Sequence, residues 1–573
     1  MLRVGVLMYQ TSASKGQELV AQRMVRELRR LGHEAYLITS QFHDGEPVVE
    51  ESEIAARGGF IHTYDEGLGI PVIRLAGWKI TWPPRRIFIK DLTAALDKIV
   101  EDLRLNVLVT HSTLWNGPEE VANYVAWKRA LARSGVPQRP LLFCHMSHYQ
   151  DPYDPRYFVE ERTYRQTWNE SALPRILAEA DLLLCVTPLE QEAMVKAGAR
   201  PERCFLFPGG IDAESLQHLP DTQLPNVPSG KKLISYLGTV EERKNTLAVL
   251  KVAKELLHER DLHFVIAGKL EGEYGERVKQ EAQGLRNVTL LGAITDAEKA
   301  ALIKASYANI LLSRSEALGL AQLEHMYMGV PIITSGVGGQ AWLIRDGEEG
   351  LVVRGPDDLE GAARAVLLLA RNPKLRAKMG RRAQQRVRHF TIMELTLALS
   401  KRLLDLLRGK QAEGEARLAP PEKVLEAWVR GRERILSTTK RLILQKDASI
   451  ISIPYSEIVR IRRHKRPRWW VLGLGLLITA ALGAAGLLRL GLYTRLSLLL
   501  EGMGLANPLL TVEAMRVSLP LLSLGLGLLA FLLSRERGFL VSCASGLRVF
   551  IGEAYERALR IADSLTPQEL FEE

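Results

Sequence analysis

Short apolar runs alternate with amphipathic helical stretches through residues 1–408 of the chain. In the first half of this region the runs predicted as strands are Val4–Tyr9, Glu34–Thr39, Asn106–Thr110, Leu141–His145, Leu182–Val186 and Cys204–Phe207. In the second half they are Leu233–Leu237, His263–Ala267, Val288–Leu291, Ala308–Leu312, Pro331–Thr334 and Gly350–Val353. Nearly continuous apolar strands that alternate with helices are typical of parallel sheets buried on both faces. The pattern therefore predicts an α/β protein with two doubly wound domains.

Domain organisation follows the changes in composition along the 573 residues. Residues 1–212 form the predicted N-terminal domain, and residues 213–230, rich in Pro, Asp, Gln and Ser, form the linker. Residues 231–408 form the second domain. Residues 409–421 are polar and contain a Pro-Pro pair, which is typical of a tether. In open α/β sheets ligands bind outside the carboxyl ends of the strands, so we expect the substrates there.

Two long uncharged segments follow, at residues 469–488 and 517–534. As helices they reach roughly the 30 Å thickness of a bilayer's hydrocarbon core, although two buried core helices are an alternative. Basic residues favour the cytoplasmic side. Those that precede the first segment are Arg460, Arg462, Arg463, Lys465, Arg466 and Arg468. The pattern predicts a multi-pass cell-membrane protein with two spans, a non-cytoplasmic loop at 489–516 and both α/β domains in the cytoplasm.

The basic cluster accounts for part of a formal net charge of +10 at pH 7. Nucleic-acid-binding segments usually interleave such residues with aromatic ones, whereas here Trp469 and Trp470 come after the cluster. A membrane edge is favoured, and we expect no nucleic-acid partner. The cluster either attracts anionic lipid or only sets the topology.

The segments that flank the two apolar runs, 422–468 and 535–573, contain short strand patterns. These are Leu442–Leu444, Ile450–Ile453, Glu457–Arg462, Phe539–Ser542 and Leu547–Ile551. Glu553–Ser564 is predicted to be helical. Together the flanks resemble a pleckstrin-homology-like bacterial module split by a transmembrane hairpin. Independent short amphipathic pieces are the alternative.

The four cysteines show no metal-binding or disulfide pattern. Cys144, Cys185 and Cys543 lie in apolar strand-like runs, and no CxxC pairing occurs. We expect free thiols in a reducing compartment. The first residues, Met1–Tyr9, have too short an apolar run for a signal peptide and are predicted to form a core strand.

Candidate chemistry centres on two glutamates eight residues apart, Glu316 and Glu324. The apolar run Asn309–Ser313 predicts a strand, and the pattern turns helical after Gly319. Glu316 therefore falls on a strand-to-helix loop and Glu324 within the helix. Unpaired N–H groups and the positive end of the dipole at a helix N-terminus suit a pyrophosphate. Glu316 can then accept sugar hydroxyls and Glu324 those of a ribose, although an incidental pair on a solvated helix is the alternative.

This segment resembles the E-x7-E signature of retaining GT-B glycosyltransferases of family 4 (group 1), and the resemblance extends over about residues 1–408. Pro208–Asp212 likewise resembles the family's P-N-G-I-D element, with Gly209 in place of Asn. The resemblance implies two Rossmann-like domains that face each other across a cleft. It also implies a final helix, about Leu395–Leu407, that crosses back to the N-terminal domain.

Positive charge for the donor phosphates is expected from Tyr236–Asn245, which looks like the family's G-T-x-x-x-R-K-N variant. A nucleoside diphosphate gains negative charge as it leaves, so Arg243 and Lys244 are suited to stabilise it. A solvated turn is the alternative. Lys269 is a further candidate phosphate contact, and so are the residues that open the helix: Leu318, Gly319 and Leu320.

The resemblance assigns the remaining donor contacts. Ile294, in Asn287–Asp296, is expected to hold the base through backbone groups. Gly16 corresponds to one glycine of the family's Gly-Gly phosphate loop, whereas the residue before it is Lys15. His145 ends a predicted strand at the position that contacts the donor sugar, and His111 is a further candidate at the end of another. Capping or buried, satisfied histidines are the alternative for both.

The leading hypothesis is a membrane-anchored, retaining hexosyltransferase with cytoplasmic catalytic domains, in which Glu316, His145 and Lys244 are catalytic. It would move a sugar from a nucleotide diphosphate donor to a lipid, lipid-linked or other glycan acceptor. No DxD spacing or metal cluster is visible, so we expect neither a metal nor a separate cofactor. A sugar-nucleotide epimerase and a non-catalytic membrane adaptor are the alternatives. The sequence leaves the oligomeric state open.

Overall fold

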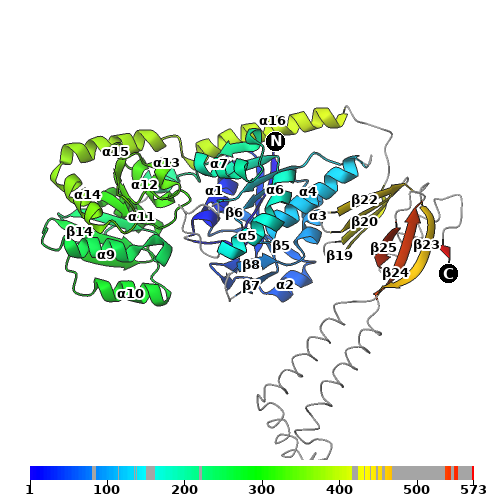
Figure 1. Cartoon of the computed structure of the whole chain (residues 1–573), viewed down its shortest axis with the longest axis horizontal. Coiled ribbons are helices and arrows are strands. Elements are labelled where there is room, and N and C mark those ends of the chain that lie inside the picture. Colours follow the sequence, from blue (N-terminus) through cyan, green and yellow to red (C-terminus); the bar gives the residue numbers. More distant parts are fainter. Residues whose placement is uncertain are drawn as a thin grey trace, which may run out of the picture. The chain divides into compact units, whose positions relative to one another are not determined.

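The computed structural model describes residues 1–13, 15–80, 86–113, 115–133, 136, 138–149, 162–217, 222–415, 424–430, 433–438, 441–446, 449–454, 458–466, 536–543, 548–552 and 571–572. The chain divides into two compact units. The first contains residues 1–130 and 138–419, and the second contains 131–137 and 420–573. Figure 1 labels their helices and strands.

The N-terminal lobe of the first unit is built on an eight-stranded sheet in the order β12-β11-β10-β9-β1-β2-β6-β5. Its strands are β1 (Arg3–Leu7), β2 (Glu34–Ser40), β5 (Phe60–Asp65), β6 (Ile70–Leu75), β9 (Val107–His111), β10 (Leu142–Met146), β11 (Leu182–Cys185) and β12 (Cys204–Leu206). All neighbours are parallel except β5 and β6. The predicted strands and the doubly wound topology are confirmed here.

Alternating side chains of the central strands enter two separate cores. Val4 and Val6 of β1 pack on the side of helix α1 (Gly16–Arg30), while Leu7 enters the core on the opposite face. That second core is covered by α3 (Leu92–Asp102) and α4 (Gly117–Arg133). The remaining helices of the lobe are α2 (Glu51–Ala56), α5 (Arg162–Ser171), α6 (Leu173–Glu179), α7 (Pro188–Lys196) and the 3-10 turn η1 (Pro201–Arg203).

The sequence pattern did not predict the elements between residues 40 and 90. Besides β5 and β6, this region forms two hairpins, β3 (Phe42–His43) with β4 (Glu46–Pro47), and β7 (Gly77–Ile80) with β8 (Arg86–Ile89). β5 and β7 contain exposed residues, as at Tyr64 and Trp78, so they lack the continuous apolar runs that identified the central strands. β6 is buried throughout, but Pro71 and Arg74 interrupt its apolar run.

The C-terminal lobe contains a six-stranded, fully parallel sheet in the order β15-β14-β13-β16-β17-β18. Its strands are β13 (Lys232–Leu237), β14 (Leu262–Ala267), β15 (Val288–Gly292), β16 (Ser306–Leu311), β17 (Ile332–Thr334) and β18 (Gly350–Val352). Its helices are η2 (Glu242–Lys244), α9 (Thr246–Glu255), α10 (Gly272–Ala282), α11 (Asp296–Ala305), α12 (Leu320–Tyr327), α13 (Gln340–Leu343), α14 (Leu359–Arg371) and α15 (Pro373–Val387). Phe264 and Ile266 of β14 pack with α9 and α14, whereas Val265 and Ala267 pack with Leu302 of α11 on the other face.

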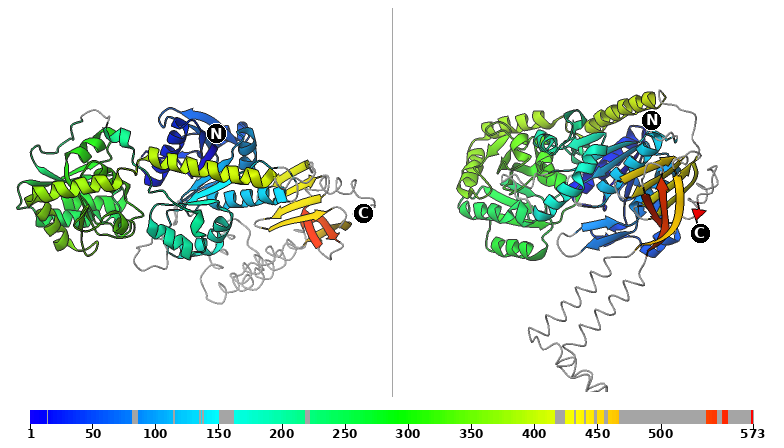
Figure 2. Two further views of the ribbon diagram at one scale, coloured as in Figure 1. Left: turned by 90° about the horizontal axis from the view of Figure 1, so that it is seen from above. Right: turned by 45° about the vertical axis from the view of Figure 1, so that its right-hand side comes forward.

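The last helix of the first unit, α16 (Ile392–Glu415), returns to the N-terminal lobe, which confirms the expected crossing (Figure 2). Ile392 N–H donates to the carbonyl of Ile211 at 2.9 Å, and Lys410 forms an ion pair with Asp181 at 2.8 Å. The prediction that the tether begins at residue 409 was therefore wrong, because the helix continues through Gly409 to Glu415. Good helix formers follow the glycine, and the ion pair holds this turn against the lobe. The predicted linker 213–230 likewise opens with a short helix, α8 (Ala213–Gln217).

The second unit contains two four-stranded sheets, in the orders β19-β20-β21-β22 and β25-β24-β23-β26. The strands are β19 (Val424–Arg430), β20 (Glu433–Thr438), β21 (Arg441–Lys446), β22 (Ser449–Pro454), β23 (Ile458–Arg466), β24 (Glu536–Cys543), β25 (Arg548–Gly552) and β26 (Phe571–Glu572). Because β23 and β24 pair, the two flanks form a common sheet rather than independent pieces. The five expected strands are thus confirmed, and β19, β20 and β26 are additional.

The two predicted spans, 469–488 and 517–534, and the loop 489–516 lie outside the described residues. The expected helix Glu553–Ser564 lies outside them as well. Within the described part of the chain, no helix combines the length and hydropathy of a membrane span.

Candidate functional site

Glu316 and Lys244 form the centre of the candidate site in the C-terminal lobe. Glu316 lies in the loop between β16 and α12 and is 7% exposed. Its Oε2 accepts a hydrogen bond from the ammonium of Lys244, which ends η2, and lies 3.8 Å from Nη1 of Arg243. Arg243 also donates from Nη1 to the carbonyl of Ser315 at 2.9 Å. The structure thus brings together three of the residues predicted to bind the donor.

The charge of Glu316 follows from two opposing effects. Burial raises the pKa of its carboxyl, but the charges of Lys244 and Arg243 outweigh burial and hold the pKa below its usual value of 4.5. Glu316 is therefore an anion at neutral pH, flanked by two cations. Such a cluster can accept hydroxyl hydrogens at the carboxylate and phosphate oxygens at the cations.

A neighbouring loop fixes the backbone around Glu316. The N–H of Gly339 donates to the carbonyl of Glu316 at 2.9 Å, and Oγ of Ser335 donates to that of Ser313 at 2.6 Å. A Cβ at Gly339 would lie 1.8 Å from the carbonyl oxygen of Ala317. Only glycine allows this approach, and it holds the carboxylate-bearing loop in place.

Helix α12 begins immediately after this loop, as predicted. Its N-cap, Gly319, has φ +96° and carries no side chain to cap the first-turn N–H groups. Gly16 at the start of α1 and Gly209 both pack against Leu320, since a Cβ would lie 3.2 Å and 2.9 Å, respectively, from its methyl groups. The beginnings of α1 and α12 are therefore close neighbours. Phosphate binding by Gly16, Leu318, Gly319 and Leu320 stays a prediction.

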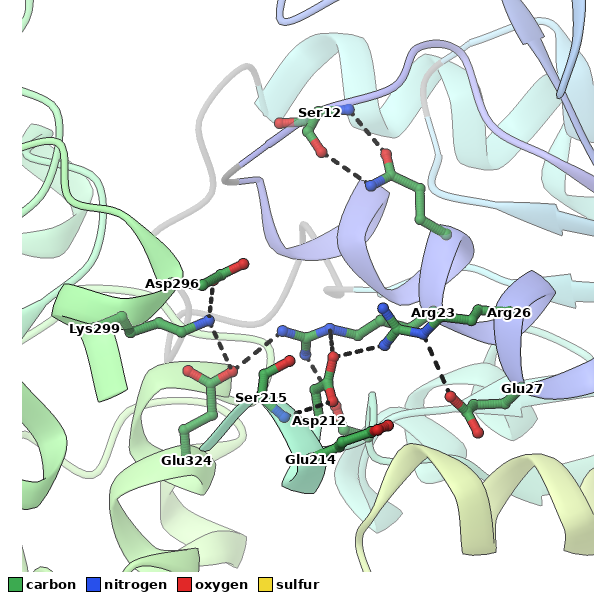
Figure 3. Close-up of polar contacts among 12 residues, drawn as sticks. Ser12, Arg23, Arg26, Glu27, Asp212, Glu214, Ser215, Asp296, Lys299 and Glu324 are labelled. Atoms are coloured by element: carbon green, nitrogen blue, oxygen red, sulfur yellow. Dashed lines mark hydrogen bonds and ion pairs between the residues drawn. The ribbon is translucent and has the colours of Figure 1, made fainter. Parts of the chain in front are cut away.

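Glu324 takes part in an ion-pair network that joins the two lobes (Figure 3). Its Oε1 lies 3.3 Å from Nη2 of Arg23 in α1 and 3.8 Å from Nζ of Lys299 in α11. Arg23 also donates to the carbonyl of Gly210 at 3.3 Å and approaches Asp212 at 3.9 Å. The sequence did not identify Arg23, because it lies 301 residues from Glu324. The ribose-binding role of Glu324 stays a prediction.

The predicted histidines form a buried cluster in the N-terminal lobe. His111 and His145 lie on neighbouring strands β9 and β10, and neither is exposed. Oγ1 of Thr110 lies 2.8 Å from Nδ1 of His145. Among the residues that the structure describes, Nε2 of His145 and both ring nitrogens of His111 have no hydrogen-bond partner. His145 is thus paired at one ring nitrogen, and the described residues supply no partner for the other or for His111.

Burial keeps these histidines neutral. It lowers the pKa of His145 to about 3 and that of His111 well below 6.5, and the proximity of His148 adds to both shifts. His148, with φ +51°, is a third member that the sequence did not single out, and burial lowers its pKa to about 4. No hydrogen bond or ion pair within the described ranges joins this cluster to Glu316. Their common role at the donor sugar stays a prediction.

Two other candidates lie at the edge of the C-terminal lobe. Lys269 is exposed and forms an ion pair with Glu271 at 2.5 Å. Ile294 is half-buried after β15 and packs against the small core of Leu233, Val265 and Leu302. Neither contact tests the proposed roles in phosphate and base binding. In the part of the chain that the structure covers, no group of three or more His, Cys, Asp or Glu residues is arranged to hold a metal. Cys144, Cys185 and Cys204 are free thiols, as expected.

Comparison with known families assigns both lobes. The sequence model described as Glycosyltransferase Family 4 matches residues 14–215, and the one described as Glycosyl transferases group 1 matches residues 221–386. The two matches coincide with the N-terminal and C-terminal lobes. This two-lobed part of the chain belongs to the group 1, family 4-like glycosyltransferases and has their GT-B fold.

Solved structures show the same fold. Sucrose-phosphate synthase from Thermosynechococcus elongatus superposes on 71% of this chain and all of its own, with a TM-score of 0.53 and 17% identity. HepE from Anabaena, solved in complex with UDP, superposes on 70% of this chain and all of its own, with a TM-score of 0.51 and 16% identity.

Relatives found by sequence match only part of this chain. D-rhamnosyltransferase WbpZ of Pseudomonas aeruginosa is 34% identical over 28% of this chain and 42% of its own. Alpha-monoglucosyldiacylglycerol synthase of Streptococcus pneumoniae is 26% identical over 40% of this chain and 54% of its own. The chain thus spans about half the length of the relatives it matches.

Proposed function

We propose that this protein is a retaining glycosyltransferase that moves a sugar from a nucleotide diphosphate donor to an acceptor at the cytoplasmic face of the cell membrane. The observation that carries the proposal is the cluster of Glu316, Lys244 and Arg243 at the start of α12. Two cations beside a buried carboxylate supply the two functions the reaction needs, which are stabilisation of the leaving diphosphate and orientation of the sugar.

In this mechanism the bond between the anomeric carbon and the diphosphate oxygen breaks, and negative charge grows on the diphosphate. Lys244, Arg243 and the N–H groups around Leu320 stabilise that charge. The anionic Glu316 accepts hydrogen bonds from sugar hydroxyls and stabilises positive character at the anomeric carbon. His145, neutral because its pKa is about 3, contributes a hydrogen bond rather than a proton.

Retention would follow if the leaving phosphate guides the acceptor hydroxyl to the same face of the sugar and accepts its proton. Donor binding then falls to the C-terminal lobe and acceptor binding to the N-terminal lobe. Closure of the lobes excludes water and limits hydrolysis of the donor. Neither a metal nor a further cofactor is required in this mechanism.

The relatives support the substrate classes. The HepE structure contains UDP, which fits a nucleotide sugar donor. The name of the Streptococcus pneumoniae relative indicates a diacylglycerol-linked product, which fits a lipid or lipid-linked acceptor. We therefore favour such an acceptor over a soluble glycan.

Membrane anchoring by residues 469–488 and 517–534 is compatible with the second unit. In the β23–β24 ladder, Arg466 pairs with Glu536, so residues 467–535 leave and re-enter the sheet at adjacent positions. A connection whose ends are adjacent crosses a membrane an even number of times, as two spans do. The sheet of β23, β24, β25 and β26, which takes strands from both flanks, would belong to the proposed pleckstrin-homology-like module.

The test uses the purified full-length protein with membrane lipid and a panel of labelled nucleotide sugars. Transfer of label to lipid, lost in Glu316→Gln, is the expected result. Glu276→Gln, at an exposed ion pair with Lys279 in α10, is the matched control and should keep full transfer. Free isomerised donor would instead indicate an epimerase, and binding without turnover would indicate a non-catalytic adaptor.

A further inference from the structure

Arg23 occupies an unusual place for a residue of the N-terminal lobe, because its guanidinium lies against the carboxylate of Glu324 in the other lobe. The Arg23 side chain is 7% exposed. Nη2 lies 3.3 Å from Oε1 of Glu324, and Nη1 donates to the carbonyl of Gly210 at 3.3 Å. Figure 3 shows the guanidinium between Glu324 on one side and Asp212 on the other. The fork of a guanidinium suits such a bridge, since it presents several donors in fixed directions.

The two acidic partners of Arg23 depend on it to different degrees. Asp212 has a shorter ion pair with Arg26, at 2.6 Å, and its Oδ1 accepts from the N–H of Ser215 at 3.2 Å. The remaining cation near Glu324 is Lys299, at 3.8 Å, which pairs more closely with Asp296, at 2.8 Å. Loss of Arg23 would therefore leave Asp212 well paired and Glu324 poorly paired.

The two oxygens of Glu324 are used unequally. Oε1 faces both Arg23 and Lys299. No hydrogen bond to Oε2 is found in the part of the chain that the structure describes. A carboxylate that is held through one oxygen and retains the other as an acceptor is prepared to receive a hydroxyl group in a defined direction.

We infer that Arg23 is a positioning residue for nucleotide binding: from the N-terminal lobe, it orients the Glu324 carboxylate that receives the ribose hydroxyls of the donor. The inference rests on the proposed function, since it assumes a nucleotide donor. It goes further in making recognition of the ribose depend on both lobes. Binding of the nucleotide to the C-terminal lobe is then favoured by the position of α1 in which Arg23 reaches Glu324.

The test compares ribonucleoside diphosphates with their 2′,3′-dideoxy counterparts on the full-length protein, by calorimetry with UDP, GDP and ADP. Hydrogen bonds to a charged group predict that the native protein prefers the ribose form of its nucleotide by about tenfold or more. Arg23→Gln should reduce this preference to about threefold or less, while affinity for the dideoxy form changes by less than about twofold. Arg26→Gln, which removes a partner of Asp212 but not of Glu324, is the matched control and should keep the full preference.

Two further variants separate positioning from a structural role. Glu324→Gln and the double variant Arg23→Gln/Glu324→Gln should show the same small preference, because Arg23 acts only through the carboxylate. Arg23→Lys keeps the charge and should restore part of the preference, and it replaces Arg23→Gln if that variant does not fold.

Four outcomes would count against the inference or against the function on which it rests. An unchanged ribose preference in Arg23→Gln, or an equal loss for ribose and dideoxy forms, would show that Arg23 does not act through the ribose. A native protein that binds a nucleotide without ribose preference would remove the role of Glu324 while leaving the proposed function in place. A native protein that binds none of the three nucleotides would contradict the proposed function itself.

Discussion

Lys244 offsets the burial of Glu316, so its removal measures how far this carboxylate depends on its partner. Lys244→Met leaves Glu316 with Arg243, whose Nη1 is 3.8 Å away. We expect the free energy of unfolding at pH 7 to fall by about 2 kcal/mol, since the carboxylate loses a hydrogen bond from a charged group while Arg243 remains beside it. Chemical denaturation of the two proteins gives this difference directly.

The pH dependence of that difference identifies Glu316 as its origin. The pKa of Glu316 is depressed in the folded state, so its ion pair stabilises the protein above pH 4.5 and is lost as pH falls through the folded pKa. The difference in free energy of unfolding between Lys244→Met and the native protein should therefore become smaller as the pH is lowered from 7 to 4. Lys269→Met removes an exposed lysine and should leave stability unchanged at both values. If the difference in free energy of unfolding does not depend on pH, Lys244 stabilises the protein by packing alone.

The buried histidines predict sensitivity to mild acid. Burial lowers the pKa of His145 to about 3, whereas the unfolded chain binds its proton near pH 6.5. Stability is therefore lost as pH falls below 6.5, by about 2 kcal/mol for this residue at pH 5. His145→Gln should reduce the loss of unfolding free energy between pH 7 and pH 5 by about that amount, as measured by denaturant titration. His258→Gln, at an exposed position, should not change it.

At the residue scale, local patterns predicted the Glu316 cluster better than the network around Glu324. Glu316 and Lys244 each follow a recognisable strand-to-turn motif, and parallel strands place such turns at one edge of a sheet. Arg23 lies in a helix whose sequence carries no comparable signal. Its contact with Glu324 depends on how two lobes pack, and spacing along the chain does not encode that. The same holds for His148, which is half-buried after β10 and follows no such motif.

At the element scale, the presence of an uninterrupted apolar run decided which strands could be predicted. Strands such as β1 and β13 read as continuous apolar runs, and their observed ends differ from the predicted ones by a few residues at most. The edge strand β5 and the hairpin of β7 and β8 carry exposed residues and were missed. Helix α16 extends beyond the predicted end because the polar composition and the Pro-Pro pair of 409–421 indicated a tether, although a glycine such as Gly409 costs a helix only about 1 kcal/mol.

The contact between α12 and the loop at Gly209 can be tested with two glycines of the same conformation. Gly209 and Gly230 both have φ +73°, so alanine suffers the same backbone strain at either position. A Cβ at Gly209 would lie 2.9 Å from a methyl of Leu320, whereas nothing lies within 4 Å at Gly230. We expect Gly209→Ala to cost about 1 kcal/mol more than Gly230→Ala in denaturant titration.

The same pair of variants reports on the site. Displacement of Leu320 shifts the first turn of α12, so Gly209→Ala should also weaken nucleotide binding, while Gly230→Ala should not. Equal stabilities and equal affinities would show that the start of α12 adapts to the added methyl group without moving the residues that bind the phosphates.

At the scale of the whole molecule, the GT-B lobes and their crossing helix follow from sequence, because each lobe repeats a doubly wound pattern. The second unit was harder to predict. Its strands are short, and β23 is strongly basic along its length, with Arg460, Arg462, Arg463, Lys465 and Arg466. Pairing with β24, some seventy residues later, is what makes it a strand of a sheet, and no local pattern indicates that partner.

That pairing allows the proposed anchor to be removed without disturbing the sheet. Since Arg466 and Glu536 are opposite each other in an antiparallel ladder, an Asn-Gly turn can replace residues 467–535. We expect the shortened protein to move from the membrane fraction to the supernatant after ultracentrifugation without detergent. Its affinity for the nucleoside diphosphate should stay within about twofold of the native value, because the donor site belongs to the first unit.

A salt wash distinguishes this anchor from electrostatic adhesion of the basic strand. At 1 M salt the Debye length is about 3 Å, so attraction between basic residues and anionic lipid is largely screened. Native protein held by two spans resists this wash, whereas protein held by β23 alone is released. Retention of the shortened chain in the membrane fraction at low salt, followed by its release at 1 M, would place the attachment in the basic strand. Residues 467–535 would then not be a membrane anchor, because any connection that leaves the sheet at Arg466 and returns at Glu536 has the same adjacent ends.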